Sequence, residues 1–431
     1  MDLEVRALEV RANEEADDAR MFFVRGLGAT AVVALHAAVA YLVHPFPGLE
    51  WPTQDTANTA IDLFAWWIEL WVMPLFLVVS GCMAGISLRR RGMPEWFFRR
   101  MRRLGGPLLL SLIVLLPLDA YVWMFGWYLE GLVTLDEIRR VKFSGDVGQN
   151  LLGSSHLWFL IYVLSYCLLI GMLYWMLKMV ARQSSSEPRL DRISDTTGAS
   201  DRTIQANNHS GWRTIHALGN PMAMVMLTIG SFSLLIWYPQ VVFGFQHAFL
   251  PVKEKWLYSG CYFFAGYVLS FDASLLCHVR RWRGAYYTVA LVASFLAVAC
   301  GIRYLEADGF QGVMSGIMLA GFTCAAAWGA ALAALDFGLG CADDPKVSTF
   351  LKPWGAASAW SMIVRFGRAS YWIYLVHHPV VGATHVGLKY FFPGVPSLAK
   401  YALTFAMGML VPLLLRQLWK VASRGCFSTS S

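Results

Sequence analysis

The residues from Met21 to Val43, MFFVRGLGATAVVALHAAVAYLV, form an apolar stretch interrupted by one arginine and one histidine. This length suits a helix that crosses a bilayer. Arg25 and His36 are eleven positions apart, so they lie within about 20° of one helix face and about 16 Å apart along its axis. Ionisable groups inside a membrane helix commonly mark a substrate path or a catalytic centre. The alternative is an interfacial arginine and a core histidine bonded to a carbonyl.

The whole chain is strongly apolar. Of its 431 residues, 57% are hydrophobic and only 15% are charged, which excludes an ordinary soluble domain. Runs of spanning length predict an all-α polytopic membrane protein, a bundle of about ten transmembrane helices. The predicted spans are 21–43, 62–88, 104–125, 156–179, 220–244, 256–276, 284–302, 311–337, 368–391 and 399–419.

Lysine and arginine are distributed unequally between the predicted loops. With the N-terminus in the cytoplasm, 27 of the 35 lysines and arginines fall on the cytoplasmic side. The positive-inside rule requires such an asymmetry. We therefore predict a multi-pass protein of the cell inner membrane with both termini cytoplasmic. Because the basic residues line one face of the lipid bilayer, no nucleic-acid partner is expected.

Polar segments set the predicted domain limits. Residues 1–20 form an N-terminal cytoplasmic tail, residues 21–420 a membrane domain and residues 421–431 a C-terminal tail. Within the membrane domain, residues 182–219 are rich in Ser, Thr, Asn, Asp and Arg and are predicted to be a flexible cytoplasmic loop.

No metal site is predicted from the cysteines or the histidines. The eight cysteines are scattered without paired spacing. The adjacent His377 and His378 point about 100° apart on a helix, so they cannot both face one ion from a regular turn.

The predicted second helix carries a polar line. Asp62, Glu69 and Ser80 are separated by seven and eleven residues, which places them near one face. Glu69 could orient a base, bind an acceptor hydroxyl or pair with a cation from another helix. Ser80 could contact a substrate, or Ser80 and Gly81 could let two helices approach closely.

Seven arginines lie between Arg89 and Arg103. One interpretation is topology and contact with anionic lipids. The other is that some of them grip the phosphates of a coenzyme-A thioester, because guanidinium groups match phosphate oxygens bidentately. The candidates for this role are Arg99, Arg100, Arg102 and Arg103.

Two further strings are distinctive. His156-Leu157-Trp158-Phe159-Leu160 opens the predicted fourth helix, where His156 and Trp158 belong to an aromatic belt or stack a sugar ring. Ser370-Tyr371-Trp372-Ile373-Tyr374-Leu375-Val376-His377-His378-Pro379 lies in the ninth. There Tyr374 and His378 share a face, and Pro379 frees the carbonyl of Leu375 for another partner.

Together these motifs resemble the membrane-bound acyltransferase family 3. Its mark, an arginine and a histidine separated by ten residues in the first helix, is similar to Arg25 and His36. The Ser80-Gly81 pair, the basic loop from Arg99 to Arg103 and the stretch Phe263-Phe264-Ala265-Gly266 look like later landmarks of that family. The strings at 156–160 and 374–379 look specifically like the branch of glucans biosynthesis protein C, which is implicated in placing succinyl groups on osmoregulated periplasmic glucans.

The resemblance implies an acyltransferase domain over 21–420 and catalytic roles for His36 and Arg25. It implies succinyl-CoA or acetyl-CoA as donor substrate, a periplasmic or envelope glycan as acceptor, and no permanently bound cofactor. Neutral His36 would serve as general base for a sugar hydroxyl, or would take the acyl group covalently. Ser80, Glu69, Tyr374 and His378 are candidates for orienting the base or the acceptor. The alternative function is a transporter that uses Arg25 and His36 for anion binding or a proton relay.

Overall fold

The computed structural model describes residues 2–143, 146–151, 153–184, 221–245, 248–271, 273–307, 309, 312–340 and 356–428. Across these ranges all regular secondary structure is helical, which confirms the predicted all-α class. The predicted loop at 182–219 lies outside the described residues apart from its first three positions. Of the predicted C-terminal tail, residues 421–428 are described, and they form the end of the last helix.

Each of the ten predicted spans corresponds to a helix. These helices are α1 (Asp2–Ala38), α2 (Thr59–Arg91), α4 (Gly106–Leu129), α7 (Trp158–Ser184), α9 (Pro221–Trp237), α11 (Lys253–Leu269), α13 (Arg283–Glu306), α14 (Val313–Gly340), α16 (Ala356–Phe391) and α17 (Ser397–Ser428). In the described ranges, seven helical segments are long and apolar enough to cross a membrane, and α9 is apolar but shorter. The predicted span 220–244 is too long, because Pro239 opens a separate turn beyond α9.

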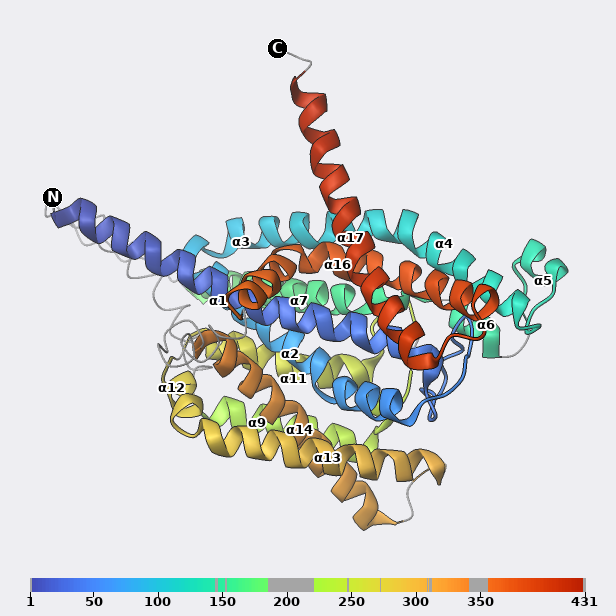
Figure 1. Cartoon of the computed structure of the whole chain (residues 1–431). Helices are drawn as coiled ribbons and strands as arrows, with labels where there is room; N and C mark the ends of the chain where they lie inside the picture. The colour runs from blue at the N-terminus through green and yellow to red at the C-terminus, as the bar shows by residue number, and fades with distance from the viewer. Residues whose placement is uncertain are drawn as a thin grey trace, which may run out of the picture.

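Short helices connect the long ones. They are the 3₁₀ turn Val39–Tyr41, α3 (Met93–Arg100), the π-helical turn Met101–Gly105, α5 (Leu135–Arg140), α6 (Asp146–Leu151), the 3₁₀ turn Ser155–Leu157, α10 (Gln240–Phe243) and α12 (Ala273–Arg281). In Figure 1 most of the long helices lie side by side across the view, with α3 and α12 at one end of the bundle and α5 and α6 at the other. The outward face of α4 exposes Leu109, Leu110, Ile113 and Val114, as expected for a surface in contact with lipid.

Helices α1 and α16 run parallel and in close contact. A Cβ atom added to Gly26 would overlap the carbonyl oxygen of Ile363, and one added to Gly367 would overlap that of Phe22. Only glycine allows two helix backbones to approach so closely. Ten residues beyond Gly26 and Gly367 stand His36 and His377, so this crossing sets the register of the two histidines.

A second glycine contact joins α2 to α11. A Cβ atom on Gly81 would overlap the backbone of Phe263, and one on Gly266 would overlap that of Val78. The small-residue interpretation is therefore confirmed for Gly81. Two landmarks separated by some 180 positions in the chain are the two sides of one helix crossing.

The loops at the end of the bundle beyond His36 interlock. The amide of Glu50 donates to Asn150 over 3.1 Å, and the amide of Phe245 donates to the carbonyl of Pro47 over 2.8 Å. Asp55 binds Lys400 of α17 at 2.7 Å. Burial alone would raise the pKa of the Asp55 carboxyl, but the hydrogen bonds from Lys400 and the Thr56 amide, together with the charges of Lys400 and Lys389, outweigh it and lower that pKa below its usual value.

Candidate functional site

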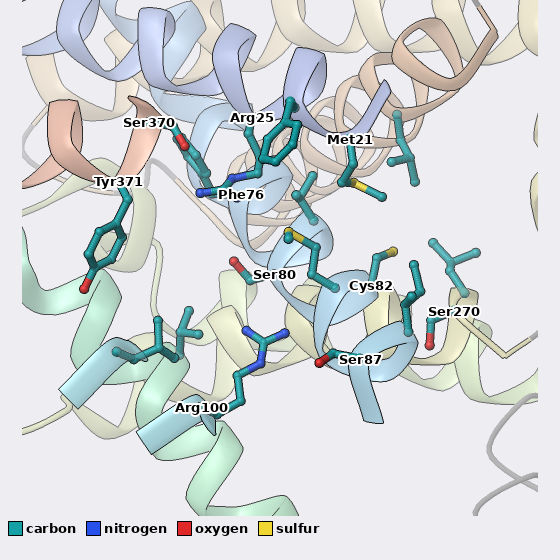
Figure 2. Close-up of a pocket in the computed structure, with 18 of the residues that line it drawn as sticks. Met21, Arg25, Phe76, Ser80, Cys82, Ser87, Arg100, Ser270, Ser370 and Tyr371 are labelled. Carbon is teal, nitrogen blue, oxygen red and sulfur yellow. The ribbon is translucent and has the colours of Figure 1, made fainter. Parts of the chain in front are cut away.

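A cavity of about 1240 Å³ opens at the end of the bundle where the basic segments gather. Its lining includes nine arginines from five segments of the chain: Arg20, Arg25, Arg89, Arg90, Arg91, Arg99, Arg100, Arg103 and Arg280. In Figure 2, Arg25 and Arg100 extend into the cavity from opposite walls, with Ser80 between them. The cavity therefore joins the arginine of the first helix to the basic cluster that follows the second.

Three of the four arginines predicted in the basic loop line this cavity. Arg99, Arg100 and Arg103 do so, whereas Arg102 is exposed and is not among the lining residues. The reason is helical geometry, since two positions turn a side chain by about 200° and point Arg102 away from the face of Arg100.

Positive charge dominates the cavity wall. Among the described residues that line it, Asp336 is the one that is acidic, and its carboxylate lies 3.7 Å from Arg280. Glu95 also pairs with Arg91 and Arg99, but the arginines still outnumber these carboxylates, and the excess positive charge favours a ligand that carries several negative charges. Phosphate groups fit this requirement, because arginine binds their oxygens through paired, charge-assisted hydrogen bonds.

The inner end of the cavity is less polar and approaches His36. Val32, one helical turn before His36, belongs to its lining, as do Tyr371 and Tyr374 of α16. The hydroxyl of Tyr371 is buried and has no hydrogen-bond partner within the described chain. A long ligand with an anionic head and an apolar arm would fit this gradient from arginine to aromatic surface.

Beyond this inner end, four histidines from three helical segments lie together. The ring centroid of His36 lies 5.0 Å from those of His377 and His378, and that of His156 lies 4.6 Å from that of His378. His156 and His378 are buried, whereas His36 is only partly covered. The structure therefore brings together His36, His156 and His378, which the sequence singled out, and adds His377.

The hydrogen bonds of His377 define the form of His36. Nδ1 of His377 lies 2.9 Å from the carbonyl oxygens of Ile373 and Tyr374, so it must carry the proton that both can accept. Its Nε2, when the ring is neutral, then accepts from Nδ1 of His36 over 2.9 Å. This chain of bonds leaves Nε2 of His36 unprotonated, with a lone pair for use as a base or a nucleophile.

His378 has a different kind of partner. Its Nδ1 donates to the carboxylate of Asp119 on α4 over 2.8 Å. The other carboxylate oxygen accepts from the hydroxyl of Ser155 over 2.7 Å. Because both oxygens of Asp119 accept hydrogen bonds, the group is held as a carboxylate, and a neutral His378 ring that donates through Nδ1 has an unprotonated Nε2.

His156 is fixed by the backbone of α16. Its Nε2 donates to the carbonyl of Leu375 over 3.0 Å, the carbonyl that Pro379 frees, so the predicted effect of this proline is confirmed. The hydroxyl of Tyr374 donates to the carbonyl of His156. Tyr374 therefore joins two helices in addition to lining the cavity.

The loop between α1 and α2 covers the histidine cluster on the side away from the arginines. The buried indole of Trp51 donates to Nδ1 of His385 over 2.9 Å, and its ring stacks beside that of His36. Nε2 of His385 donates in turn to the carbonyl of Ala37 over 2.9 Å. Trp51 thus ties the loop to both helices that carry the cluster.

Two predicted site residues lie elsewhere. Trp158 packs against Tyr162, and the ammonium group of Lys255 lies 4.2 Å from the centroid of the Trp158 ring. Lys255 is also the electrostatic partner of Glu69. Glu69 and Trp158 therefore belong to a neighbouring interhelical contact, and neither lines the arginine cavity.

Asp119, His156 and His378 are close enough to hold a metal ion, since one ligand atom of each lies within 4.8 Å of the others. In this structure hydrogen bonds account for these groups: Asp119 accepts from His378 and Ser155, and His156 donates to Leu375. The arrangement is that of a histidine–carboxylate pair beside a second histidine.

Asp119 and His377 are the residues that the sequence analysis did not select. A signal for Asp119 exists, because it is the one acidic residue in the predicted span 104–125 and such residues are costly in a bilayer. His377 offers no comparable signal. Its role depends on which of two adjacent histidines faces α1, and the register of the helix crossing decides that.

Comparison with known proteins supports the resemblance found in the sequence. Residues 19–417 match the family model of the acyltransferase domain, Acyl_transf_3, which spans nearly the whole chain. Among curated proteins and solved structures, none gives a significant match. The matched range contains the arginine cavity, the histidine cluster and all ten long helices or their central parts. The chain belongs to the membrane-bound acyltransferase family 3 and is an acyltransferase.

Proposed function

We propose that the protein is an O-acyltransferase that moves a succinyl or acetyl group from cytoplasmic acyl-CoA to a hydroxyl of a periplasmic or cell-envelope glycan. One observation carries the proposal. A single cavity runs from a wall of arginines to the turn of α1 that precedes His36.

The shape and charge of the cavity match an acyl-CoA donor. Such a donor has phosphates at one end, a long and weakly polar arm, and the thioester at the other end. Arg25, Arg99, Arg100 and Arg103 would bind the phosphates through charge-assisted hydrogen bonds. The rise of α1 places His36 about 16 Å beyond Arg25, a distance that the arm would cover.

His36 has the form that acyl transfer needs. Its Nδ1 proton is held by Nε2 of His377, so its own Nε2 has a free lone pair. That nitrogen would attack the thioester carbon or take a proton from a hydroxyl.

The proposed acceptor and orientation rest on two further points. The strings at 156–160 and 374–379 are similar to glucans biosynthesis protein C, and both contribute to the histidine cluster. The cluster also lies toward the end of the bundle opposite the arginines, which the positive-inside rule assigns to the periplasm. An acceptor from that side would meet the acyl group without crossing the bilayer. We therefore propose the inner membrane as the location, with both termini cytoplasmic.

The test is acyl transfer in membrane vesicles that contain the envelope glycans of the same cells. Radiolabelled succinyl-CoA and acetyl-CoA are supplied, and wild type is compared with His36→Ala. His278→Ala removes an exposed histidine on α12 and serves as the matched control. We expect label on glycan from wild type and the control, and loss of label from His36→Ala. Equal labelling in all three would contradict the role of His36, and glycan movement without CoA consumption would favour a transporter.

A further inference from the structure

The two histidine pairs in the cluster have partners of different charge. His36 is hydrogen-bonded to His377, a neutral ring, whereas His378 is hydrogen-bonded to Asp119, a carboxylate. With neutral rings, both pairs leave Nε2 of His36 and of His378 unprotonated, and the two rings meet edge to face at 5.0 Å. Two potential bases therefore stand side by side with different electrostatic support.

We propose that His378, positioned by Asp119, is a second acid–base group that takes the proton of the acceptor hydroxyl, while His36 receives the acyl group from the donor. This assignment rests on the proposed function. It names the residue that acts in the second step, the transfer of the acyl group to the acceptor hydroxyl.

The charge of each partner supports the assignment. A base becomes positive when it takes a proton, and an adjacent carboxylate stabilises that positive charge. Asp119 provides this for His378. His377 provides no charge for His36, but it can accept the Nδ1 proton of His36 and so keep an acylated ring neutral. The His36–His377 pair therefore suits a nucleophile, and the His378–Asp119 pair suits a general base.

The position of Asp119 supports a functional role. The carboxylate is buried in an apolar helix, 2% exposed, and a buried charge in a membrane helix is retained at a substantial cost in free energy. Its oxygens are fixed by His378 and by Ser155 at 2.7 Å. His156 stacks on the His378 ring, with the two planes 13° apart. These contacts hold the ring of His378 in one orientation.

The reaction balances in two steps. First, Nε2 of His36 attacks the thioester carbon, the C–S bond breaks, the CoA thiolate leaves, and the Nδ1 proton of His36 moves to Nε2 of His377. Second, the acceptor O–H gives its proton to Nε2 of His378 while its oxygen bonds to the acyl carbon and the C–N bond breaks. His36 then regains its proton from His377. The proton on His378 passes to water and balances the thiolate released earlier.

The two steps can be measured separately on the reconstituted full-length chain. Without glycan, the release of CoA thiol reports acylation of His36. With envelope glycan, labelled product reports the complete reaction. Hydroxylamine is a strong nucleophile that needs little general-base help, so its acyl hydroxamate reports the acylated enzyme independently of His378.

We expect His378→Asn to retain the burst of CoA release and hydroxamate formation, and to lose about 10²–10⁴-fold in transfer to glycan. Asp119→Asn should show the same pattern, and Asp119→Glu should recover part of the transfer. His36→Asn should lose the burst and both products. His278→Asn, on the surface of α12, should match wild type. A merely structural defect would reduce burst and hydroxamate along with glycan product.

Several outcomes overturn the proposal. The first is loss of the CoA burst in His378→Asn. The second is glycan transfer by that variant within about threefold of wild type. The third is the absence of a burst in a wild type that does transfer acyl groups to glycan. If wild type contained stoichiometric zinc and His378→Asn lost it, Asp119, His156 and His378 would be metal ligands. This result would also overturn the proposal. If wild type moves no acyl group from CoA to glycan at all, the proposed function itself fails, and this result is distinct from the others.

Discussion

The arginine cavity and the histidine cluster hold their polar side chains in opposite ways. The cavity is wide and nine arginines from several segments line it together, so binding would depend on their summed charge. The cluster is mostly buried, and each histidine has a defined hydrogen-bond partner. The difference teaches that losing one arginine should weaken binding gradually, whereas losing one histidine contact should change the chemistry abruptly.

The sharpest way to test this contrast is to remove the partner of His36. His377→Leu keeps a similar volume but removes the acceptor of the His36 Nδ1 proton, so His36 can adopt the other tautomer. We expect transfer to fall by about 10²–10⁴-fold, as when a histidine base is left in the wrong tautomer. The measurement is the rate of glycan labelling at saturating acyl-CoA. Activity within threefold of wild type would show that His377 does not set the form of His36.

The next largest effect should come from the crossing of α1 and α16. In Gly367→Ala the added methyl group meets the backbone of Phe22, so the helices must separate and the His36–His377 bond must lengthen. We expect transfer to fall by about 10–100-fold, since small displacements of catalytic groups have effects of this size. Gly387→Ala, in the same helix but with open space around its Cβ position, is the matched control. Equal activity of the two variants would argue against a register set by this crossing.

A smaller effect, confined to KM for the donor, should follow from single arginine substitutions in the cavity. Arg100→Gln removes one of several contacts in a wide cavity, worth about 1–1.5 kcal/mol, so KM for acyl-CoA should rise by about 5–13-fold with kcat nearly unchanged. Arg102→Gln, three positions from Arg99 but exposed and outside the lining, should leave KM within about twofold of wild type. A similar KM change in both variants would mean that the loop acts by its overall charge and not through this cavity.

The smallest effect on catalysis should come from the loop clamp between Asp55 and Lys400. The pKa of Asp55 is lowered in the folded state, so the clamp stabilises the protein above the usual pKa of aspartate and loses this contribution as pH falls through the folded value. Lys400→Met should lower thermal stability at pH 7 and reduce this acid dependence, with transfer at 25 °C nearly unchanged. Thermal unfolding at pH 7 and near pH 3 checks this. A variant as stable as wild type at pH 7 would contradict it.

Much of the fold was predictable because hydropathy and helix length are local properties. The ten long helices lie where apolar runs predicted them, and Pro239 explains why α9 is shorter than its predicted span. It was also predictable that the carbonyl of Leu375 is freed for another partner, since a proline removes a local donor whatever the tertiary structure. His156 fills that position, although the sequence did not identify it as the partner.

The candidate site was predictable only in part. Arg25 and His36 follow from the periodicity of one helix, but the pairing of His36 with His377 and of His378 with Asp119 depends on the register between helices. Trp158 shows the same limit, because Lys255 brings it into an interhelical contact. For Glu69 the alternative predicted from the sequence, a cation from another helix, is the one that the structure shows. Periodicity gives the face of a helix, and packing decides what that face meets.

The glycine crossing of α1 and α16 has a consequence for how this protein tolerates change. Gly26 and Gly367 stand ten residues before His36 and His377 on helices that run in the same direction. The glycines fix where the two helices touch, and the equal spacing of ten residues then brings the two histidines to the same level. Inserting or deleting one residue in either ten-residue interval would leave every catalytic side chain present and the bundle intact, yet rotate one histidine by about 100° away from its partner. The length of these intervals, as much as their composition, should therefore be fixed by selection for activity.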